Sequence, residues 1–315
     1  MRALNVPAAG EHERLSDLPV PDVTAGHVLI RVTAAGLNAV DNFVAIGMLG
    51  GRWPRAFPVI LGRDAAGVVE AVGPGVTQVR VGDEVVGTVP LATPIHAGTL
   101  AEYAVMPADA VAAKPAGLDF VSAAAIPFAG AVAIAAVDAV DPRPGRRVLV
   151  NGASGGVGSY AIQLLAARAA DVVATGTPCD ADRLRRLGAG TVLDYRAAPV
   201  AEQVLAAYPE GVDALIDLVA YTAGTLPLAA VATGGVVASA LGAADGETLA
   251  AAGLTGGNVT GNVTSPLIAR LAHQAAAGTP AVDVTSVLPL DRATDGLRQL
   301  ATGKARGKIV VSVAG

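Results

Sequence analysis

The segment that most constrains the fold of this chain is VLVNGASGGVGSYAIQLL, residues 148–165. It begins with an apolar, strand-like run, continues through small residues rich in glycine, and ends in an amphipathic segment typical of a helix. The N–H groups of a helix's first turn have no partner within the helix, and glycine lets another molecule approach them closely. We therefore expect a strand, a tight turn and a helix, with an anion bound at the turn.

Strand-like and helix-like segments continue to alternate after this point. The expected strands are RVLVNG, DVVATG, TVLDY, VDALIDLV and GGVVASALG, and the helices between them include residues 157–170 and a segment near 226–232. Alternation of this kind builds a parallel sheet covered by helices on both faces. We expect a doubly wound domain over residues 122–264.

The chain before residue 120 has a different texture. Short runs such as HVLIRVTAAG, AAGVVEAVG, DEVVGTV and LAEYAVM are separated by turn residues, which predicts a compact antiparallel barrel. The last fifty residues mix helix-like and strand-like segments and are expected to return to that barrel. The fold class is therefore α/β, with residues 1–121 and 265–315 forming one domain and residues 122–264 the other.

Composition narrows the partners and the compartment. Only 16% of the 315 residues are charged and the net charge of -5 is spread along the chain, which argues against nucleic-acid and membrane-surface partners. A single cysteine, Cys179, excludes an intramolecular disulfide, and the first residues hold no continuous apolar run, so we expect a cytoplasmic protein. The uncharged stretch 120–137 is expected to be a buried helix pair, because Pro127 and Gly130 interrupt it.

The glycine turn fits the frame of a dinucleotide-binding fingerprint. In G-x-G-x-x-G, alanine takes the first place here, and the strand before the turn and the helix after it supply the context that the motif requires. The alternative is a glycine-rich turn that serves only close helix packing. The cofactor-binding candidates in the turn are Ala153, Ser154, Gly155, Gly156, Val157 and Gly158.

The end of the second strand bears on which dinucleotide binds. NAD sites usually place Asp or Glu there, whereas this chain has Thr175 and Thr177, a rim that accepts a 2′-phosphate. We therefore predict NADPH. Arg183 and Tyr195 are candidate partners of that phosphate, although Arg183 is equally consistent with a solvated helix charge. Further cofactor contacts are expected at strand ends, at the backbone of Leu218 and Leu241.

Several ordered motifs resemble one known family along nearly the whole chain. The stretches AAGLNAVD, ILGRDAAGVVEAVGPGVTQVRVGDEVVG, GTLAEYAVMPAD, NGASGGVG, RRLGAGTVLDY and ARGKIVVSV look like the zinc-independent, zeta-crystallin-like quinone oxidoreductases of the medium-chain dehydrogenase/reductase superfamily. The resemblance implies a GroES-like barrel, a Rossmann domain and an NADPH cleft between them. It also implies a homodimer formed largely through the last strand of the Rossmann sheet.

Two positions depart from the zinc-dependent relatives. Asn38 and Arg63 stand where those proteins supply a thiolate and an imidazole to a catalytic zinc. Neither side chain is a zinc ligand and an arginine cation repels a metal, so no metal site is predicted. By resemblance, Asn38 and Asp41 lie beside the nicotinamide as the catalytic candidates, with the Asn38 amide orienting the acceptor oxygen. The alternative for Asp41 is a helix N-cap or a charge partner of Arg63.

The loss of zinc changes the expected reaction. Without a Lewis acid, the easier substrates are conjugated and electron-poor, because charge spreads onto a remote oxygen as hydride arrives. The expected function is an NADPH-dependent, zinc-independent reductase of a small quinone or α,β-unsaturated carbonyl, with the product's proton coming from water. The alternatives are an enoyl reductase in a biosynthetic pathway and a non-catalytic NADPH-binding protein. A zinc alcohol dehydrogenase is disfavoured by Asn38 and Arg63.

Overall fold

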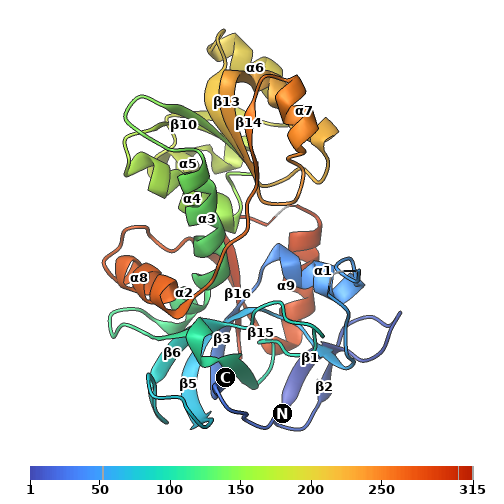
Figure 1. Ribbon diagram of the computed structural model, residues 1–315. Helices are drawn as coiled ribbons and strands as arrows, with labels where there is room; N and C mark the ends of the chain where they lie inside the picture. Colours follow the sequence, from blue (N-terminus) through green and yellow to red (C-terminus); the bar gives the residue numbers. More distant parts are fainter. Residues whose placement is uncertain (52, 304, 314–315) are drawn as a thin grey trace. The chain divides into compact units, whose positions relative to one another are not determined.

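A computed structural model describes residues 1–51, 53–303 and 305–313 of the chain (Figure 1). Its contacts divide the chain into two compact units, Met1–Phe128 with Val263–Gly315, and Ala129–Asn262. The first unit is thus built from both ends of the sequence. The sequence predicts two domains, 1–121 with 265–315 and 122–264. These limits remain a proposal for the functional domains.

The second unit is built on a six-stranded sheet whose neighbouring strands are all parallel. The strands lie in the order β11-β10-β9-β12-β13-β14, which is the order of a doubly wound dinucleotide-binding sheet. They are β9 (Arg147–Asn151), β10 (Asp171–Gly176), β11 (Thr191–Asp194), β12 (Val212–Asp217), β13 (Val231–Ser239) and β14 (Thr255–Asn258). The helices between and around them include α3 (Pro127–Ala139), α4 (Gly156–Ala166), α5 (Ala181–Arg186), α6 (Val200–Ala207) and α7 (Gly246–Ala251). The α/β prediction is confirmed.

The central strands are apolar because helices cover the sheet. Val148, Leu149 and Val150 of β9 are fully buried, as are Leu215 and Ile216 of β12. A strand that is buried on both faces reads as a continuous hydrophobic run rather than an alternating one. This explains why the sequence pattern located these strands.

The helix expected near residues 226–232 is wrong. The chain forms short 3-10 turns at Ala223–Thr225 and Leu228–Ala230, and β13 already begins at Val231. Pro227 lies between the two turns and cannot donate a helical hydrogen bond. The β-branched residues of the following segment pair with β12 instead.

The first unit contains a seven-stranded sheet and a smaller three-stranded one. The larger follows the order β15-β16-β3-β5-β6-β8, with β7 also paired to β3, and the smaller follows β2-β1-β4. The strands are β1 (Arg2–Val6), β2 (Arg14–Asp17), β3 (His27–Gly36), β4 (Val59–Ile60), β5 (Asp64–Val72), β6 (Glu84–Thr88), β7 (Tyr103–Pro107), β8 (Val111–Ala113), β15 (Val284–Pro289) and β16 (Lys308–Ser312). The helices are α1 (Ala39–Ile46), α2 (Phe120–Ala124), α8 (Ser265–Ala276) and α9 (Ala293–Ala301).

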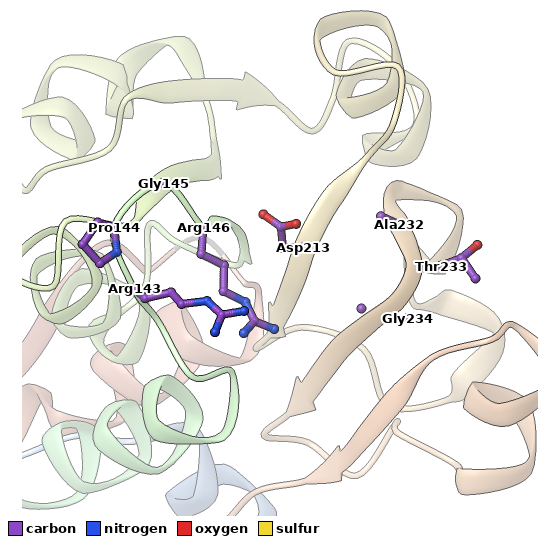
Figure 2. A pocket seen from close by; sticks show the side chains of 9 residues that line it. Arg143, Pro144, Gly145, Arg146, Asp213, Ala232, Thr233 and Gly234 are labelled. Carbon is purple, nitrogen blue, oxygen red and sulfur yellow. The ribbon is translucent and has the colours of Figure 1, made fainter.

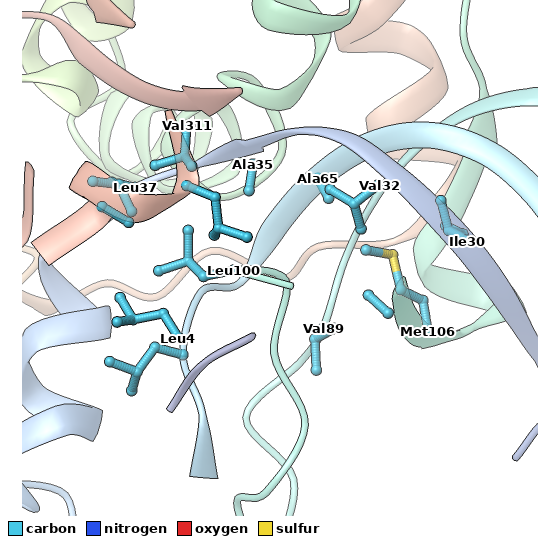
Figure 3. Close-up of a cluster of buried hydrophobic side chains, with 14 of the residues drawn as sticks. Leu4, Ile30, Val32, Ala35, Leu37, Ala65, Val89, Leu100, Met106 and Val311 are labelled. Atoms are coloured by element: carbon cyan, nitrogen blue, oxygen red, sulfur yellow. The ribbon is translucent and has the colours of Figure 1, made fainter. Parts of the chain in front are cut away.

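The core of the first unit joins residues from opposite ends of the chain. Leu4, Leu37 and Leu100 pack with Val311 of the last strand, and Met106 closes the cluster beside Ile30 and Val32 (Figure 3). Antiparallel pairing of β16 with β3 sets Val310 opposite Gly36. This pairing brings the first residues of β16 next to the residues that follow β3.

The uncharged stretch 120–137 forms two helices, as expected. α2 ends at Ala124 and α3 starts at Pro127, a position where proline is tolerated because its missing N–H would have had no helical partner. Ala123, Ala124, Ala133 and Val137 are fully buried. No helix within the described residues is long and apolar enough to cross a membrane.

Candidate functional site

The glycine loop, residues 152–158, connects β9 to α4 in the second unit. Gly152 has a φ of +86°, a conformation that favours glycine, and α4 begins after Gly155 without a side-chain cap. A Cβ on Gly158 would lie 2.6 Å from the Cα of Ala153, so only glycine fits between helix and turn. A Cβ on Gly155 would meet only the carbonyl oxygen of Gly152, at 3.6 Å. The loop is therefore tight on its inner side and open at the helix start.

The open side of the loop has the groups that a phosphate needs. The first N–H groups of α4 have no helical partners, and the helix dipole adds partial positive charge there. Behind this open side, the Ser154 hydroxyl is buried beside Gly176 and has no protein hydrogen-bond partner. This hydroxyl, the uncapped helix start and the space at Gly155 fit a pyrophosphate, so these residues of the fingerprint could hold a dinucleotide.

A chain of polar side chains fixes the loop from beneath. Gly152 donates its N–H to the Thr175 hydroxyl at 2.9 Å, and that hydroxyl lies 3.2 Å from the Asn151 side-chain oxygen. Asn151 donates from its amide nitrogen to Asp217 at 2.7 Å. Burial raises the pKa of Asp217, while Asn151 and the backbone N–H of Ala220 oppose that shift. The ends of β10, β9 and β12 are thus tied to one another and to the loop.

This network changes the role expected for Thr175. The sequence placed Thr175 at the rim that meets a 2′-phosphate, but the residue is only 2% exposed and its hydroxyl bonds the loop. Thr175 is therefore a support for the turn. Asn151 and Asp217 were missed by sequence reasoning, although both lie at strand ends on the edge where ligands bind in such sheets.

The remaining 2′-phosphate candidates lie after β10 and β11. Arg183 donates to the Ser154 carbonyl oxygen at 2.9 Å and lies 3.4 Å from Asp180, so it is held against the glycine loop and is not a freely solvated charge. Thr177 binds Asp180 through both its N–H and its hydroxyl. The Asp180 carboxylate is buried by these contacts. Tyr195 is half exposed and donates its N–H to Gly176.

Leu218 and Leu241 follow the ends of β12 and β13. Leu218 donates its N–H to the Asn151 carbonyl oxygen at 3.0 Å, and its side chain lies beside Gly152. Leu241 is partly buried and precedes Gly242, whose φ is +88°. The structure therefore brings Leu218 to the glycine loop and leaves Leu241 at the next strand end.

A hollow of about 410 Å³ lies near the amino-terminal ends of the strands of the six-stranded sheet (Figure 2). It is lined by Arg143 and Arg146, which precede β9, by Asp213 of β12 and by residues 232–235 of β13. These residues are at the amino-terminal ends or early parts of the strands. Dinucleotides bind parallel sheets of this order at the carboxyl ends, so this hollow is not the cofactor site.

Five side chains of the first unit form a buried polar cluster: Asn38, Asp41, Arg63, Asp64 and Lys308. Asn38 has the largest exposed fraction, 6%, and both aspartates are fully buried. The Asn38 side chain donates to Asp64 at 2.9 Å and accepts from Lys308 at 2.6 Å. The cluster holds two acidic and two basic side chains, which balances charge in a site that excludes water.

Asn38 takes the N-cap position of α1, and Asp41, three residues on, makes the other contact of its alternative interpretation, with Arg63. Its carboxylate accepts the backbone N–H of Asn38 at 2.8 Å, which closes the start of α1, and it lies 3.9 Å from Arg63 Nε. Burial raises the pKa of Asp41 from 3.8 to about 7, and Arg63 opposes this shift. Burial is thus the dominant influence on the pKa of this carboxyl, and it favours the neutral form.

Arg63 stands at the sequence position where the zinc-dependent relatives supply an imidazole to the metal. It is 2% exposed and donates to the carbonyl oxygens of Ala97, at 2.7 Å, and Val89, at 3.4 Å. Burial lowers the pKa of Arg63, while Asp41 and Asp64 oppose the shift. Within the described residues, no three His, Cys, Asp or Glu side chains group in a way that could hold a metal ion.

Two members of the cluster were missed by sequence reasoning. Asp64 adjoins Arg63 in the GRDAAG stretch and accepts the N–H of Phe128 at 3.1 Å as well as the Asn38 amide. Lys308 lies 270 residues from Asn38 in the sequence. The signal for Asp64 was a charged residue at the start of a mostly apolar strand, whereas Lys308 lies in the ARGKIVVSV motif with nothing in the sequence to relate it to Asn38.

The chain is similar to known proteins along most of its length. Residues 24–116 match the alcohol dehydrogenase GroES-like domain and residues 187–311 match the zinc-binding dehydrogenase family. The chloroplastic NADPH-dependent alkenal/one oxidoreductase of Arabidopsis thaliana is 31% identical over 301 residues, which cover 94% of this chain and 74% of that protein. The chain belongs to the zeta-crystallin-like quinone oxidoreductase branch of the medium-chain dehydrogenase/reductase superfamily.

Two solved structures extend the family comparison. A mycobacterial protein complexed with NADPH is 30% identical with a TM-score of 0.86, over 99% of this chain and all of that one. A structure named NAD-dependent alcohol dehydrogenase is 31% identical with a TM-score of 0.86, and the match covers both chains fully. The chain spans 50 to 57% of the length of several other curated relatives. The names of the two solved structures thus include both nicotinamide cofactors, NAD and NADPH.

Proposed function

We propose that this protein is an NADPH-dependent, zinc-independent reductase that transfers hydride to a quinone or an α,β-unsaturated carbonyl compound. The observation that carries the proposal is the closed polar cluster of the first unit. Asp41 lies 3.9 Å from Arg63, Asp64 accepts from the Asn38 amide that Lys308 also contacts, and Asn38 and Arg63 are not metal ligands. An acceptor that needs no metal to polarise it is the chemistry that this cluster suits.

The residues divide the work between binding and orientation. Held by the glycine loop, NADPH would supply a hydride for the acceptor's β-carbon; the displaced π-electron pair would go to the carbonyl oxygen, and water would supply the balancing proton. The glycine loop and Ser154 bind the pyrophosphate. Asn38 orients the acceptor oxygen through its amide, and Asp41 holds the start of α1, where Asn38 lies. Hydrogen-bond donors placed where charge develops are an effective means of lowering the barrier.

The preference for NADPH is supported by the charges beside the glycine loop. Arg183 contacts Ser154 and offers a cation to a 2′-phosphate, while Asp180 is buried under Thr177 and Arg183. A carboxylate held in this way is not free to accept hydrogen bonds from the ribose hydroxyls of NADH. The relative named as NADPH-dependent and the NADPH-bound mycobacterial structure support the same cofactor.

The proposal includes a cytoplasmic homodimer. β14 is the edge strand of the six-stranded sheet, paired on one side with β13. An edge strand presents unpaired N–H and C=O groups, and a second copy of the chain is a partner that satisfies them. Sedimentation of the purified protein tests this part of the proposal, and a monomer at all concentrations contradicts it.

The experiment that tests the proposed function is the initial rate of NADPH oxidation by purified protein. A simple 1,4-quinone and a linear enone serve as separate acceptors, NADH replaces NADPH in parallel, and zinc content is measured on the same sample. We expect turnover with NADPH and no stoichiometric zinc. Turnover that requires added zinc, or a preference for NADH, contradicts the proposal.

Two alternatives give different results in the same assay. An enoyl reductase of a biosynthetic pathway reduces a more specialised enoyl substrate in preference to both simple acceptors. A non-catalytic binding protein binds one equivalent of NADPH and shows no continuing oxidation of NADPH with either acceptor. The observation that keeps the second alternative open is that every acid in the buried polar cluster is already engaged with protein partners.

A further inference from the structure

Lys308 is an unusual lysine, because its ammonium group is buried in the first unit. The residue is 3% exposed, and its Nζ donates to the Leu37 carbonyl oxygen at 2.7 Å and to Asn38 Oδ1 at 2.6 Å. Burial lowers the pKa of Lys308, while Asp64 and Asp41 oppose that shift. The ammonium is held at this position because β16 pairs with β3, whose last residue, Gly36, immediately precedes Leu37.

The partners of Asn38 determine the orientation of its amide. A lysine ammonium has only donors, so the Asn38 group that faces Lys308 must be the oxygen. On the opposite side, Asp64 accepts from Asn38 Nδ2 at 2.9 Å, so the group that faces Asp64 must be the nitrogen. One Nδ2 hydrogen is used by Asp64, and the other faces the Gly36 carbonyl oxygen at the longer distance of 3.4 Å.

We propose that Lys308 is a positioning residue that orients the Asn38 amide and strengthens its second N–H as a donor, so that this N–H exchanges its long bond to the Gly36 carbonyl oxygen, 3.4 Å, for one to the acceptor oxygen. This inference rests on the proposed function. A cation on the amide oxygen draws electron density from the nitrogen, because hydrogen bonds in series polarise one another. Asn38 is also the most exposed member of the cluster, and so the one best able to meet a bound molecule.

The proposed step places negative charge where Lys308 can act on it. As hydride adds to the β-carbon, the carbonyl oxygen gains the displaced electron pair, and a proton from water then completes the saturated product. Lys308 keeps its proton and forms no bond to the substrate. Its contribution is greatest where that oxygen carries most charge, so a linear enone depends on it more than a quinone, which spreads the charge over a ring.

The test compares Lys308→Met and Lys308→Gln with a matched control, Lys114→Met. Lys114 is also a nearly buried lysine of the first unit, and its Nζ donates to the carbonyl oxygens of Leu118, at 2.5 Å, and Pro115. Glutamine retains an N–H donor without the charge, and it serves as the second variant if the methionine protein does not fold. Rates are measured with NADPH and both acceptors.

We expect Lys308→Met to lower kcat with the enone by about tenfold or more and to lower kcat with the quinone by several times less. Lys308→Gln should lie between wild type and Lys308→Met, and Lys114→Met should retain wild-type kcat with both acceptors. Equal losses on the two acceptors, or equal losses in Lys308→Met and Lys114→Met, would mean that the lysine only supports the fold and would overturn the inference.

A second readout needs no turnover. The chain has six asparagines, so selective ¹⁵N-asparagine labelling gives few side-chain amide signals, and Asn38→Asp identifies the one from Asn38. In wild type this amide should exchange slowly with solvent, and in Lys308→Met it should shift and exchange faster. An unchanged signal overturns the positioning role. If wild type oxidises no NADPH, the proposed function fails and the catalytic half of this inference fails with it, while the amide signal still decides whether Lys308 holds Asn38.

Discussion

Replacing Gly155 with alanine should separate cofactor binding from protein stability. The new Cβ would meet only the Gly152 carbonyl oxygen, at 3.6 Å, and the backbone at Gly155, with φ −79° and ψ 176°, is one that alanine adopts. Glycine is a better N-cap than alanine, but alanine restricts the unfolded chain, and these effects offset to within about 1 kcal/mol. The free energy of unfolding should therefore change little.

The same methyl group would occupy the space where a pyrophosphate oxygen approaches the start of α4. A hydrogen bond to a charged group contributes about 1.5–3 kcal/mol, and each 1.4 kcal/mol changes an affinity tenfold. Loss of one such bond should raise the Kd for NADPH by roughly 10- to 100-fold. The measurement is a fluorescence titration with NADPH, together with thermal unfolding of the same sample.

Gly246→Ala is the matched control, because Gly246 lies at the start of another helix of the second unit, α7, and its Cβ would have no neighbour within 4 Å. It should bind NADPH as wild type does. Gly158→Ala provides the contrast, since its Cβ would lie 2.6 Å from Ala153 Cα and destabilise the fold by about 1–3 kcal/mol. If Gly155→Ala keeps wild-type affinity, the glycine loop is not the phosphate site and the reasoning is refuted.

Three further substitutions or conditions probe the two units. Arg183→Leu should weaken NADPH binding by about tenfold while leaving NADH binding nearly unchanged, because only NADPH carries the 2′-phosphate; titration with both cofactors measures this. Thr175→Val should lower the free energy of unfolding by about 1–2 kcal/mol and weaken cofactor binding, because it removes the acceptor for the Gly152 N–H; denaturation and titration check it. The pKa of Asp41, about 7 in the folded protein against an ordinary 3.8, means that the folded state holds a proton that the unfolded chain has released between these pH values. Stability should therefore fall as pH rises from about 4 to about 7, by about 4 kcal/mol in total, and then level off, which denaturant titrations across this pH range measure.

Each of these predictions has a control or a contrary result. Arg186→Leu removes an exposed charge from the same helix and should leave both affinities unchanged; an equal effect from it would remove the special role of Arg183. Thr175→Ser keeps the hydroxyl and should behave as wild type. Asp41→Asn should flatten the dependence of stability on pH. The buried side chains of Arg63, Asp64 and Lys308 face the same site, and burial also raises the pKa of Asp64. If the slope is unchanged in Asp41→Asn, the pH dependence arises from Asp64.

The elements that the sequence predicted are those whose signals are local. The apolar run at Val148–Val150, the small residues after it and the amphipathic segment that follows are read directly from neighbouring residues, and they gave the strand, the turn and α4. The helix expected near residues 226–232 was wrong because Pro227 interrupts the segment and the residues from Val231 onward pair with β12.

The sequence by itself determined the α/β class, the glycine loop and the absence of zinc-ligand side chains at positions 38 and 63. Only the tertiary structure decided the surroundings of those positions. Lys308 reaches Asn38 across 270 residues because β16 pairs with β3, and Thr175 faces Gly152 because β10 lies beside β9. A buried polar group must find its partner wherever packing places one, and packing joins strands that are distant in the chain. Such pairings leave no periodic trace in the sequence: Lys308 lies in the ARGKIVVSV motif, but nothing in that motif indicates that its side chain meets Asn38.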